Sequence, residues 1–85
     1  MRELVSVNGN VTAPDQARIS VFDRGFLYGD SVYEVVRSYD RVLFAVEPHV
    51  ERLFRSASRI GLDIGKSPHE IIQDLRRTYA KSEIN

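Results

Sequence analysis

The stretch at residues 23–37, DRGFLYGDSVYEVVR, most constrains what this chain can fold into. Gly25 and Gly29 bracket large apolar and aromatic residues, and a β-prone run at residues 31–39, SVYEVVRSY, follows at once. Glycine adopts backbone angles that other residues resist, so both glycines are predicted to mark tight bends that deliver the chain into a strand. Asp23 can accept backbone N–H bonds as the cap of a single helical turn before Gly29.

In a strand over residues 31–39, successive side chains point to opposite faces. Tyr33, Val35 and Arg37 then share one face, and Glu34 lies on the other. An ionisable residue on each otherwise apolar face indicates a strand that lines a functional site. The alternative, that Glu34 and Arg37 reach solvent near a sheet edge, is left open by the pattern.

Tyr33 and Arg37 are the first candidates for chemistry. Placed two pleats apart on one strand face, a phenol and a guanidinium can meet an anionic group of a substrate. The competing interpretation is packing, because tyrosine on a half-buried strand ordinarily packs in the core.

Two hairpins are predicted in the first half of the chain. Residues 4–7 are β-prone, and Asn8-Gly9 is the commonest two-residue hairpin turn, with a short return strand at residues 11–12. Alternation at residues 19–21 predicts another short strand. A second hairpin should turn at Asp40-Arg41 into residues 42–46, although arginine fits poorly where a type I′ turn favours glycine, so we expect a longer loop or another turn type.

Two helices are predicted in the second half. Residues 47–61 have Pro48 in the first turn, an apolar stripe at i, i+3, i+4 and i+7, and Gly61 as a left-handed stop. A capping box, with Ser67 as the cap and Glu70 as the third helical residue, opens the other helix. The expected class is therefore α+β: a small antiparallel sheet of hairpins packed with two C-terminal helices, in one domain.

Composition excludes several classes of function. The chain has 85 residues, a net charge of zero and a hydrophobic content of 42%, which is typical of a small globular domain. Balanced charge argues against nucleic acid as a partner. The chain has no cysteine, and its two histidines, His49 and His69, lack the spacing of a metal motif. No stretch resembles a signal peptide or a membrane span, so we expect a cytoplasmic protein with no membrane partner.

Arg52 falls on the side of the predicted helix away from the apolar stripe, together with His49, Ser56 and Arg59. Periodicity therefore predicts a solvated position, as for most charged helix faces. The same face is rich in donors that bind oxyanions. It becomes a site only if something outside this chain closes over it.

The run FDRGFLYGDSVYEVVR followed by HVERLFRSASRIGL resembles the N-terminal domain of the class IV, or fold-type IV, pyridoxal-phosphate aminotransferases. That group includes D-amino-acid aminotransferase, branched-chain aminotransferase and aminodeoxychorismate lyase. The resemblance implies that Arg52 binds the phosphate of pyridoxal 5′-phosphate and that Tyr33 lies near the substrate carboxylate. It also implies that Val35 and Arg37 shape the space for the substrate side chain, and that the enzyme is a homodimer acting on an amino acid and a 2-oxo acid.

The resemblance also implies that two catalytic groups of the family lie outside residues 1–85. In that family, a lysine that forms a Schiff base with the cofactor and a carboxylate that holds its ring nitrogen come from a second domain. Lys66 and Lys81 match no catalytic motif, so no catalytic residue is assigned. Residues 1–85 are thus expected to be an incomplete N-terminal domain, inactive alone, of an enzyme of D-amino-acid or branched-chain type. The alternatives are an aminodeoxychorismate-lyase-type enzyme and a non-catalytic module for association or phosphate binding.

Overall fold

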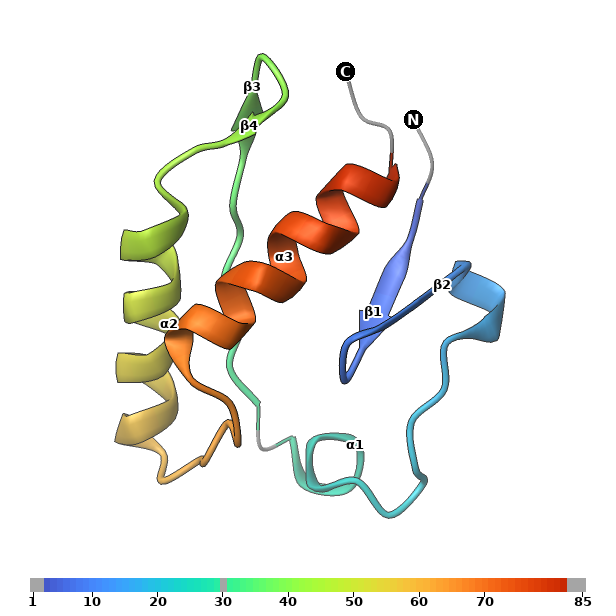
Figure 1. Ribbon diagram of the computed structural model, residues 1–85. Coiled ribbons are helices and arrows are strands. Elements are labelled where there is room, and N and C mark those ends of the chain that lie inside the picture. The colour runs from blue at the N-terminus through green and yellow to red at the C-terminus, as the bar shows by residue number, and fades with distance from the viewer. Residues whose placement is uncertain (1–2, 30, 83–85) are drawn as a thin grey trace.

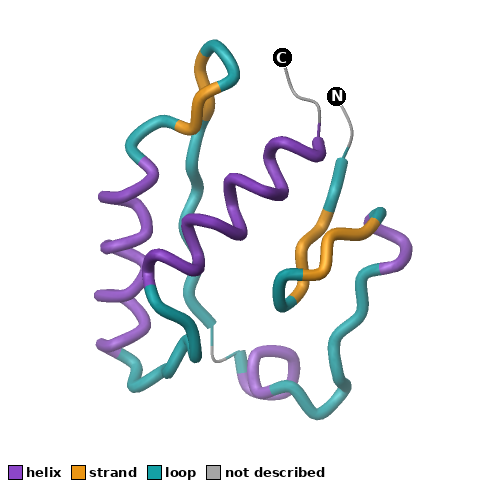
Figure 2. Tube along the Cα trace, viewed as in Figure 1, coloured by secondary structure: helices purple, strands orange, loops and turns teal. Residues whose placement is uncertain are grey.

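The computed structural model describes residues 3–29 and 31–82 and has the expected α+β class (Figures 1 and 2). Its elements, in chain order, are β1 (Val5–Val7), β2 (Asn10–Thr12), the 3₁₀ turn η1 (Pro14–Gln16), α1 (Arg24–Tyr28), β3 (Ser38–Tyr39), β4 (Val42–Leu43), α2 (Val46–Arg59) and α3 (Pro68–Ser82). The hairpins form two separate two-stranded sheets and not the single small sheet that the sequence predicted.

The first hairpin has the predicted turn. β1 and β2 pair antiparallel, with Val7 opposite Asn10, and the connecting residues Asn8 and Gly9 have φ of 52° and 85°. Positive φ at both central positions is what a type I′ turn requires. Asn and Gly tolerate those angles, so the turn chemistry of two residues determines the register of this sheet.

Residues 17–29 confirm two predictions and contradict two. Asp23 caps α1, since its Oδ2 accepts from the backbone N–H groups of Gly25 at 2.9 Å and Phe26 at 3.3 Å. Gly29 ends the turn with φ of 72°, as predicted. Gly25 lies inside α1 and marks no bend, and residues 19–21 form no strand. Alternation there was insufficient, because a strand also needs a neighbour for its backbone hydrogen bonds.

The long strand predicted over residues 31–39 is also wrong as secondary structure. Only Ser38–Tyr39 pair with another strand, and Figure 2 draws residues 31–37 as loop between α1 and the second hairpin. The alternation itself is real: Val32, Glu34 and Val36 are less exposed than Tyr33, Val35 and Arg37. The carbonyl of Arg37 accepts from the N–H of Phe44 at 2.7 Å, next to the second hairpin. Residues 32–36 have the side-chain periodicity of a strand, but they pair with no other strand among the described residues.

The second hairpin turns at the predicted place but with a different turn from the one expected. β3 and β4 are linked directly by Asp40 and Arg41, whose φ values are 49° and 67°. The turn is thus the two-residue type that arginine was expected to exclude. Tyr39 and Phe44 pack edge to face, with ring centroids 5.6 Å apart, which supports the tight connection.

α2 begins and ends close to its predicted limits. The helix starts at Val46 and ends at Arg59, with Gly61 in the left-handed region at φ 71°. The N–H of Gly61 donates to the carbonyl of Ser58 at 3.1 Å, and that of Leu62 donates to the carbonyl of Ala57 at 2.9 Å. This pair of bonds is a Schellman motif, which explains the choice of glycine at this position.

α3 opens with the predicted capping box. The Ser67 hydroxyl accepts from the N–H of Glu70 at 3.2 Å, and the Glu70 carboxylate accepts from the N–H of Ser67 at 3.0 Å. The helix packs against α2 and contacts β1, and in Figure 1 it lies between these two elements. Lys66 and Asp74 add an ion pair, Nζ to Oδ2, at 2.7 Å.

The core is small. Among the described residues, the buried apolar side chains are Val46, Val50 and Ala57, all on the inner side of α2. Many large apolar side chains are instead exposed, including Phe22, Phe26 and Tyr28 around α1. A small domain buries a smaller fraction of its surface than a large one, so this exposure accords with its length. None of the helices in the described parts of the chain is both long enough and apolar enough to cross a membrane.

Candidate functional site

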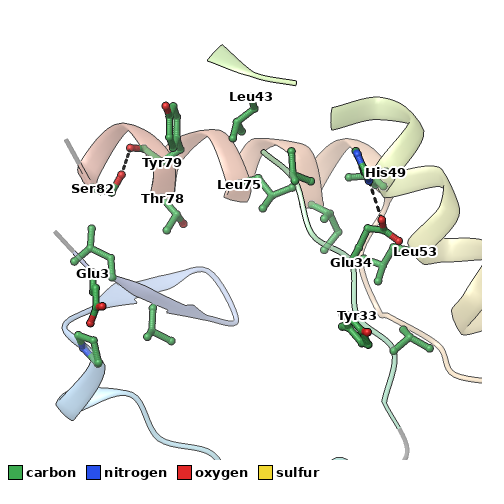
Figure 3. Close-up of a pocket in the computed structure, with 17 residues that line it drawn as sticks. Glu3, Tyr33, Glu34, Leu43, His49, Leu53, Leu75, Thr78, Tyr79 and Ser82 are labelled. Atoms are coloured by element: carbon green, nitrogen blue, oxygen red, sulfur yellow. Dashed lines mark hydrogen bonds and ion pairs between the residues drawn. The ribbon is translucent and has the colours of Figure 1, made fainter. Parts of the chain in front are cut away.

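A cluster of three ionisable side chains joins α2 to the extended segment at residues 31–37. His49 and Arg52 lie three residues apart in α2 and therefore project from neighbouring turns of one helix face. Glu34 reaches them from the inner, less exposed side of the segment. Figure 3 shows Glu34 and His49 facing each other, with the hydrogen bond between them drawn as a dashed line.

The Glu34 carboxylate is held by both partners. Its Oε2 accepts from Arg52 Nε at 3.0 Å, and its Oε1 accepts from Arg52 Nη2 in a second, short hydrogen bond. The same Oε1 lies 2.7 Å from His49 Nδ1. Arg52 thus meets the carboxylate along one edge of its guanidinium in a bidentate pair, which fixes the plane as well as the position of that group.

These contacts keep Glu34 ionised. Hydrogen bonds from Arg52 first, and then from His49, lower the pKa of Glu34 from 4.5 to about 2. The carboxylate in turn raises the pKa of Arg52. At neutral pH, the pair therefore consists of a full negative and a full positive charge, and the carboxylate can only accept hydrogen bonds.

The arrangement leaves part of Arg52 available. The Arg52 side chain is 58% exposed, whereas that of Glu34 is 14% exposed. Glu34 accepts from Nε and Nη2, and Nη1 makes no hydrogen bond to any residue that the structure describes. Guanidinium N–H groups on an exposed edge are suited to binding a phosphate or carboxylate oxygen. The donor set therefore fits the phosphate of a cofactor such as the one that the motifs imply.

The three residues predicted to contact substrate lie on the other side of the segment. Tyr33 is 85% exposed and Val35 is 65% exposed, and Arg37 is exposed as well. They alternate with Val32, Glu34 and Val36, so they share one face, as expected. No hydrogen bond joins them to Arg52 among the residues that the structure describes, but Tyr33 lines the same cavity as Glu34 and His49 (Figure 3).

A large cavity, about 910 Å³, lies between the first hairpin, residues 32–36, α2 and α3. Val36, Leu43, Leu53 and Leu75 contribute to its apolar lining, and Glu34 and His49 contribute polar groups (Figure 3). Nearby, the buried hydroxyls of Thr12 and Tyr79 have no hydrogen-bond partner in the described structure. The first hairpin, α2 and α3 are thus incompletely packed against each other around this cavity.

Reasoning from the sequence missed Glu34 and His49 as partners of Arg52. His49 was placed on the correct helix face, but Glu34 was considered only as a residue that lines a site or reaches solvent. The available signal was its position between Val32 and Val36, because a carboxylate among apolar neighbours on an inner face needs a cationic partner.

The chain is similar to D-alanine aminotransferases over nearly its whole length. It is 40% identical to the enzyme of Staphylococcus aureus (strain N315) over 82 residues, which are 96% of this chain and 29% of the relative. It is 44% identical to that of Staphylococcus haemolyticus over 80 residues, or 94% of this chain and 28% of the relative. The enzyme of Bacillus licheniformis is 38% identical over 72 residues, 85% of this chain and 25% of the relative. No known protein-family model matches the chain.

The resemblance inferred from the two motifs is therefore confirmed, as a similarity to aminotransferases. More particularly, the chain is similar to the N-terminal part of D-alanine aminotransferases. It spans less than a third of the length of these curated relatives, at 29% of the first of them.

Proposed function

We propose that the protein to which these residues belong is a pyridoxal-phosphate-dependent class IV aminotransferase that moves an amino group between a D-amino acid and a 2-oxo acid. The similarity to D-alanine aminotransferases over 96% of this chain carries the proposal. The relatives described above are named aminotransferases and not lyases, which favours transfer over the aminodeoxychorismate-lyase alternative.

Within this chain, Arg52 is proposed to bind the cofactor phosphate. Two features support that role: the guanidinium is 58% exposed, and Nη1 is not used by Glu34. When bound, the cofactor supplies the electron sink for the chemistry at the substrate α-carbon. The contribution of this chain is to anchor the phosphate, and so to orient the bound cofactor.

Tyr33, Val35 and Arg37 are proposed to form one wall of the substrate pocket. Their common exposed face supports this role, because an exposed phenol and guanidinium remain available to a carboxylate. Tyr33 would donate a hydrogen bond to the substrate carboxylate, and Val35 would limit the space for the substrate side chain. Arg37 would favour substrates with a second acidic group.

The remaining parts of the proposed enzyme lie outside these residues. A second domain would bring the lysine that attaches the cofactor and the carboxylate that pairs with its ring nitrogen. We also propose a homodimer, which would cover part of the apolar surface exposed around α1. Residues 1–85 would then form the incomplete first domain, and Lys66 and Lys81 would take no part in catalysis.

The test is an amino-transfer assay of the intact protein, purified from its natural reading frame. D-alanine, L-leucine and aminodeoxychorismate are each supplied, the first two with 2-oxoglutarate as acceptor. Formation of pyruvate from D-alanine, with D-glutamate as the second product, is the expected result. Transfer from L-leucine alone would assign the branched-chain type, and pyruvate from aminodeoxychorismate without an acceptor would assign the lyase; either result refutes the D-amino-acid proposal.

Arg52→Gln and Glu47→Gln make a matched pair of variants for the site. Both positions are exposed on α2, and Glu47 pairs with Arg76 at 3.2 Å, away from Glu34. Arg52→Gln should raise the cofactor concentration needed for half-maximal activity, whereas Glu47→Gln should leave it unchanged. Equal behaviour of the two variants would remove Arg52 from the proposed site.

A further inference from the structure

We propose that Glu34 is a positioning residue for a phosphate monoester: it holds one edge of the Arg52 guanidinium so that the remaining N–H groups are aligned for the phosphate. The inference rests on the proposed function, since it assumes that Arg52 binds the cofactor phosphate. It adds a role for a residue that touches neither the phosphate nor the substrate. Glu34 acts through Arg52 and not by contact with the reacting atoms.

The geometry supports an orienting role. An arginine side chain that is 58% exposed on a helix would otherwise sample many rotamers. The hydrogen bond from Nε to Glu34 Oε2 at 3.0 Å, together with the bond from Nη2 to Oε1, restricts it to one plane. Since Glu34 is only 14% exposed and lies between Val32 and Val36 on the less exposed face of the segment, the carboxylate is the more fixed partner of the pair.

The donors of Arg52 are divided accordingly. A guanidinium has five N–H groups, and the bidentate pair uses one on Nε and one on Nη2. Both N–H groups of Nη1 and the second N–H of Nη2 remain, and the end edge of the guanidinium consists of one N–H of Nη1 and this N–H of Nη2. This edge can donate two parallel hydrogen bonds to a phosphate. Glu34 therefore selects the end edge of Arg52 for the ligand by occupying the side edge.

His49 completes the support. Its Nδ1 is 2.7 Å from Glu34 Oε1 and 3.3 Å from Arg52 Nη2. The ionised carboxylate is an acceptor only, so Nδ1 carries a hydrogen and donates a hydrogen bond to Glu34. That bond fixes the carboxylate from a second direction and leaves His49 Nε2 directed away from the pair.

Glu34 also has an effect that opposes phosphate binding. The negative charge of Glu34 also opposes a nearby dianion, so a carboxylate that only neutralised Arg52 would weaken phosphate binding. Orientation and neutralisation predict opposite signs for the removal of Glu34. Glu34→Ala removes both effects, Glu34→Gln removes the charge and keeps one acceptor, and Glu34→Asp keeps the charge on a shorter arm.

The experiment measures binding to the intact apoprotein by absorbance titration, with pyridoxal 5′-phosphate and with pyridoxal, which lacks the phosphate. The ratio of the dissociation constant of pyridoxal to that of pyridoxal 5′-phosphate isolates the contribution of the phosphate, and a lower ratio means a smaller contribution. Residues that orient a ligating group contribute about 10–100-fold in affinity at metal sites, and we expect Glu34→Ala to lower the ratio by about tenfold. Glu34→Asp should restore part of that loss, and the control Glu47→Ala should match the wild-type protein. Circular dichroism of every variant establishes that the fold is retained.

Arg52→Gln separates the two proposals. If it lowers the ratio while Glu34→Ala does not, or if Glu34→Ala or Glu34→Gln raises the ratio, Arg52 binds the phosphate without help and the role of Glu34 is overturned. If Arg52→Gln leaves the ratio unchanged, the proposed role of Arg52 fails, and the inference fails with it. In the double variant, Glu34→Ala should cause no loss beyond that of Arg52→Gln.

Discussion

Glu34 and Arg52 form a bidentate ion pair between an extended segment and helix α2, with Arg52 Nε 3.0 Å from Glu34 Oε2. The pair unites a residue from the predicted strand with the residue predicted to bind the cofactor phosphate. It also divides the candidate site, because Tyr33, Val35 and Arg37 alternate with Glu34 and point to the other side.

The first prediction concerns the acid titration of Glu34. Its pKa is lowered from 4.5 to about 2, so its carboxyl ¹³C resonance should titrate near pH 2 in the wild-type chain. Because the folded-state pKa is the lower one, the stabilisation by this pair is complete above about pH 4.5 and is lost as the pH falls toward 2. Arg52→Gln should move the midpoint upward toward the ordinary value.

Asp74 is the internal control for that titration. The pKa of Asp74 is lowered mainly by a hydrogen bond from Lys66, and Arg52 makes no hydrogen bond to either of these residues. Its midpoint should therefore be the same in the wild-type chain and in Arg52→Gln. A Glu34 midpoint that does not change in this variant would contradict the pairing.

The second prediction concerns the capping box of α3. Ser67→Ala removes the hydroxyl that accepts from the N–H of Glu70 at 3.2 Å, and loss of such a cap typically costs about 1 kcal/mol. Urea denaturation followed by circular dichroism should show this decrease in the free energy of unfolding. Ser58→Ala, at an exposed position within α2, is the control and should change stability by less than about 0.5 kcal/mol. Equal effects would mean that the cap does not contribute.

The third prediction concerns the turn of the second hairpin. Arg41 has φ of 67°, which costs a residue with a side chain about 1–2 kcal/mol relative to favoured regions. Arg41→Gly should therefore stabilise the fold, by up to about 1 kcal/mol after the greater backbone entropy of glycine is included. Arg41→Ala removes the charge but keeps the strain, so it should not stabilise. A gain from both variants would attribute the effect to the charge.

The fourth prediction concerns residues 1–85 produced alone. Neither Lys66 nor Lys81 lies in a motif for cofactor attachment, and Lys66 is engaged with Asp74 at 2.7 Å. We expect no amino transfer and at most weak binding of pyridoxal phosphate, because a single arginine offers few contacts. Borohydride reduction after incubation with the cofactor, followed by intact-mass analysis, should show no stoichiometric pyridoxyl label. A single stable label at one lysine would contradict this expectation.

Elements defined by local hydrogen bonds could be predicted from the sequence. The Asn8-Gly9 turn, the Asp23 cap, the Ser67–Glu70 capping box and the stop at Gly61 each depend on residues a few positions apart. The side-chain alternation at residues 31–37 was predictable for the same reason, since the direction of each side chain follows from extended backbone. The resemblance to aminotransferases likewise needed only the residue types and their order.

What the sequence could not determine depends on segments distant along the chain. Whether residues 31–37 form a strand requires a partner to accept their hydrogen bonds, and the pattern of one segment does not specify the other. The ion pair of Glu34 is of this kind, since the carboxylate could have faced solvent equally well by its periodicity. Only the packing of that segment against α2 brought Glu34 to His49 and Arg52. By alternation, the same packing left Tyr33 on the opposite side.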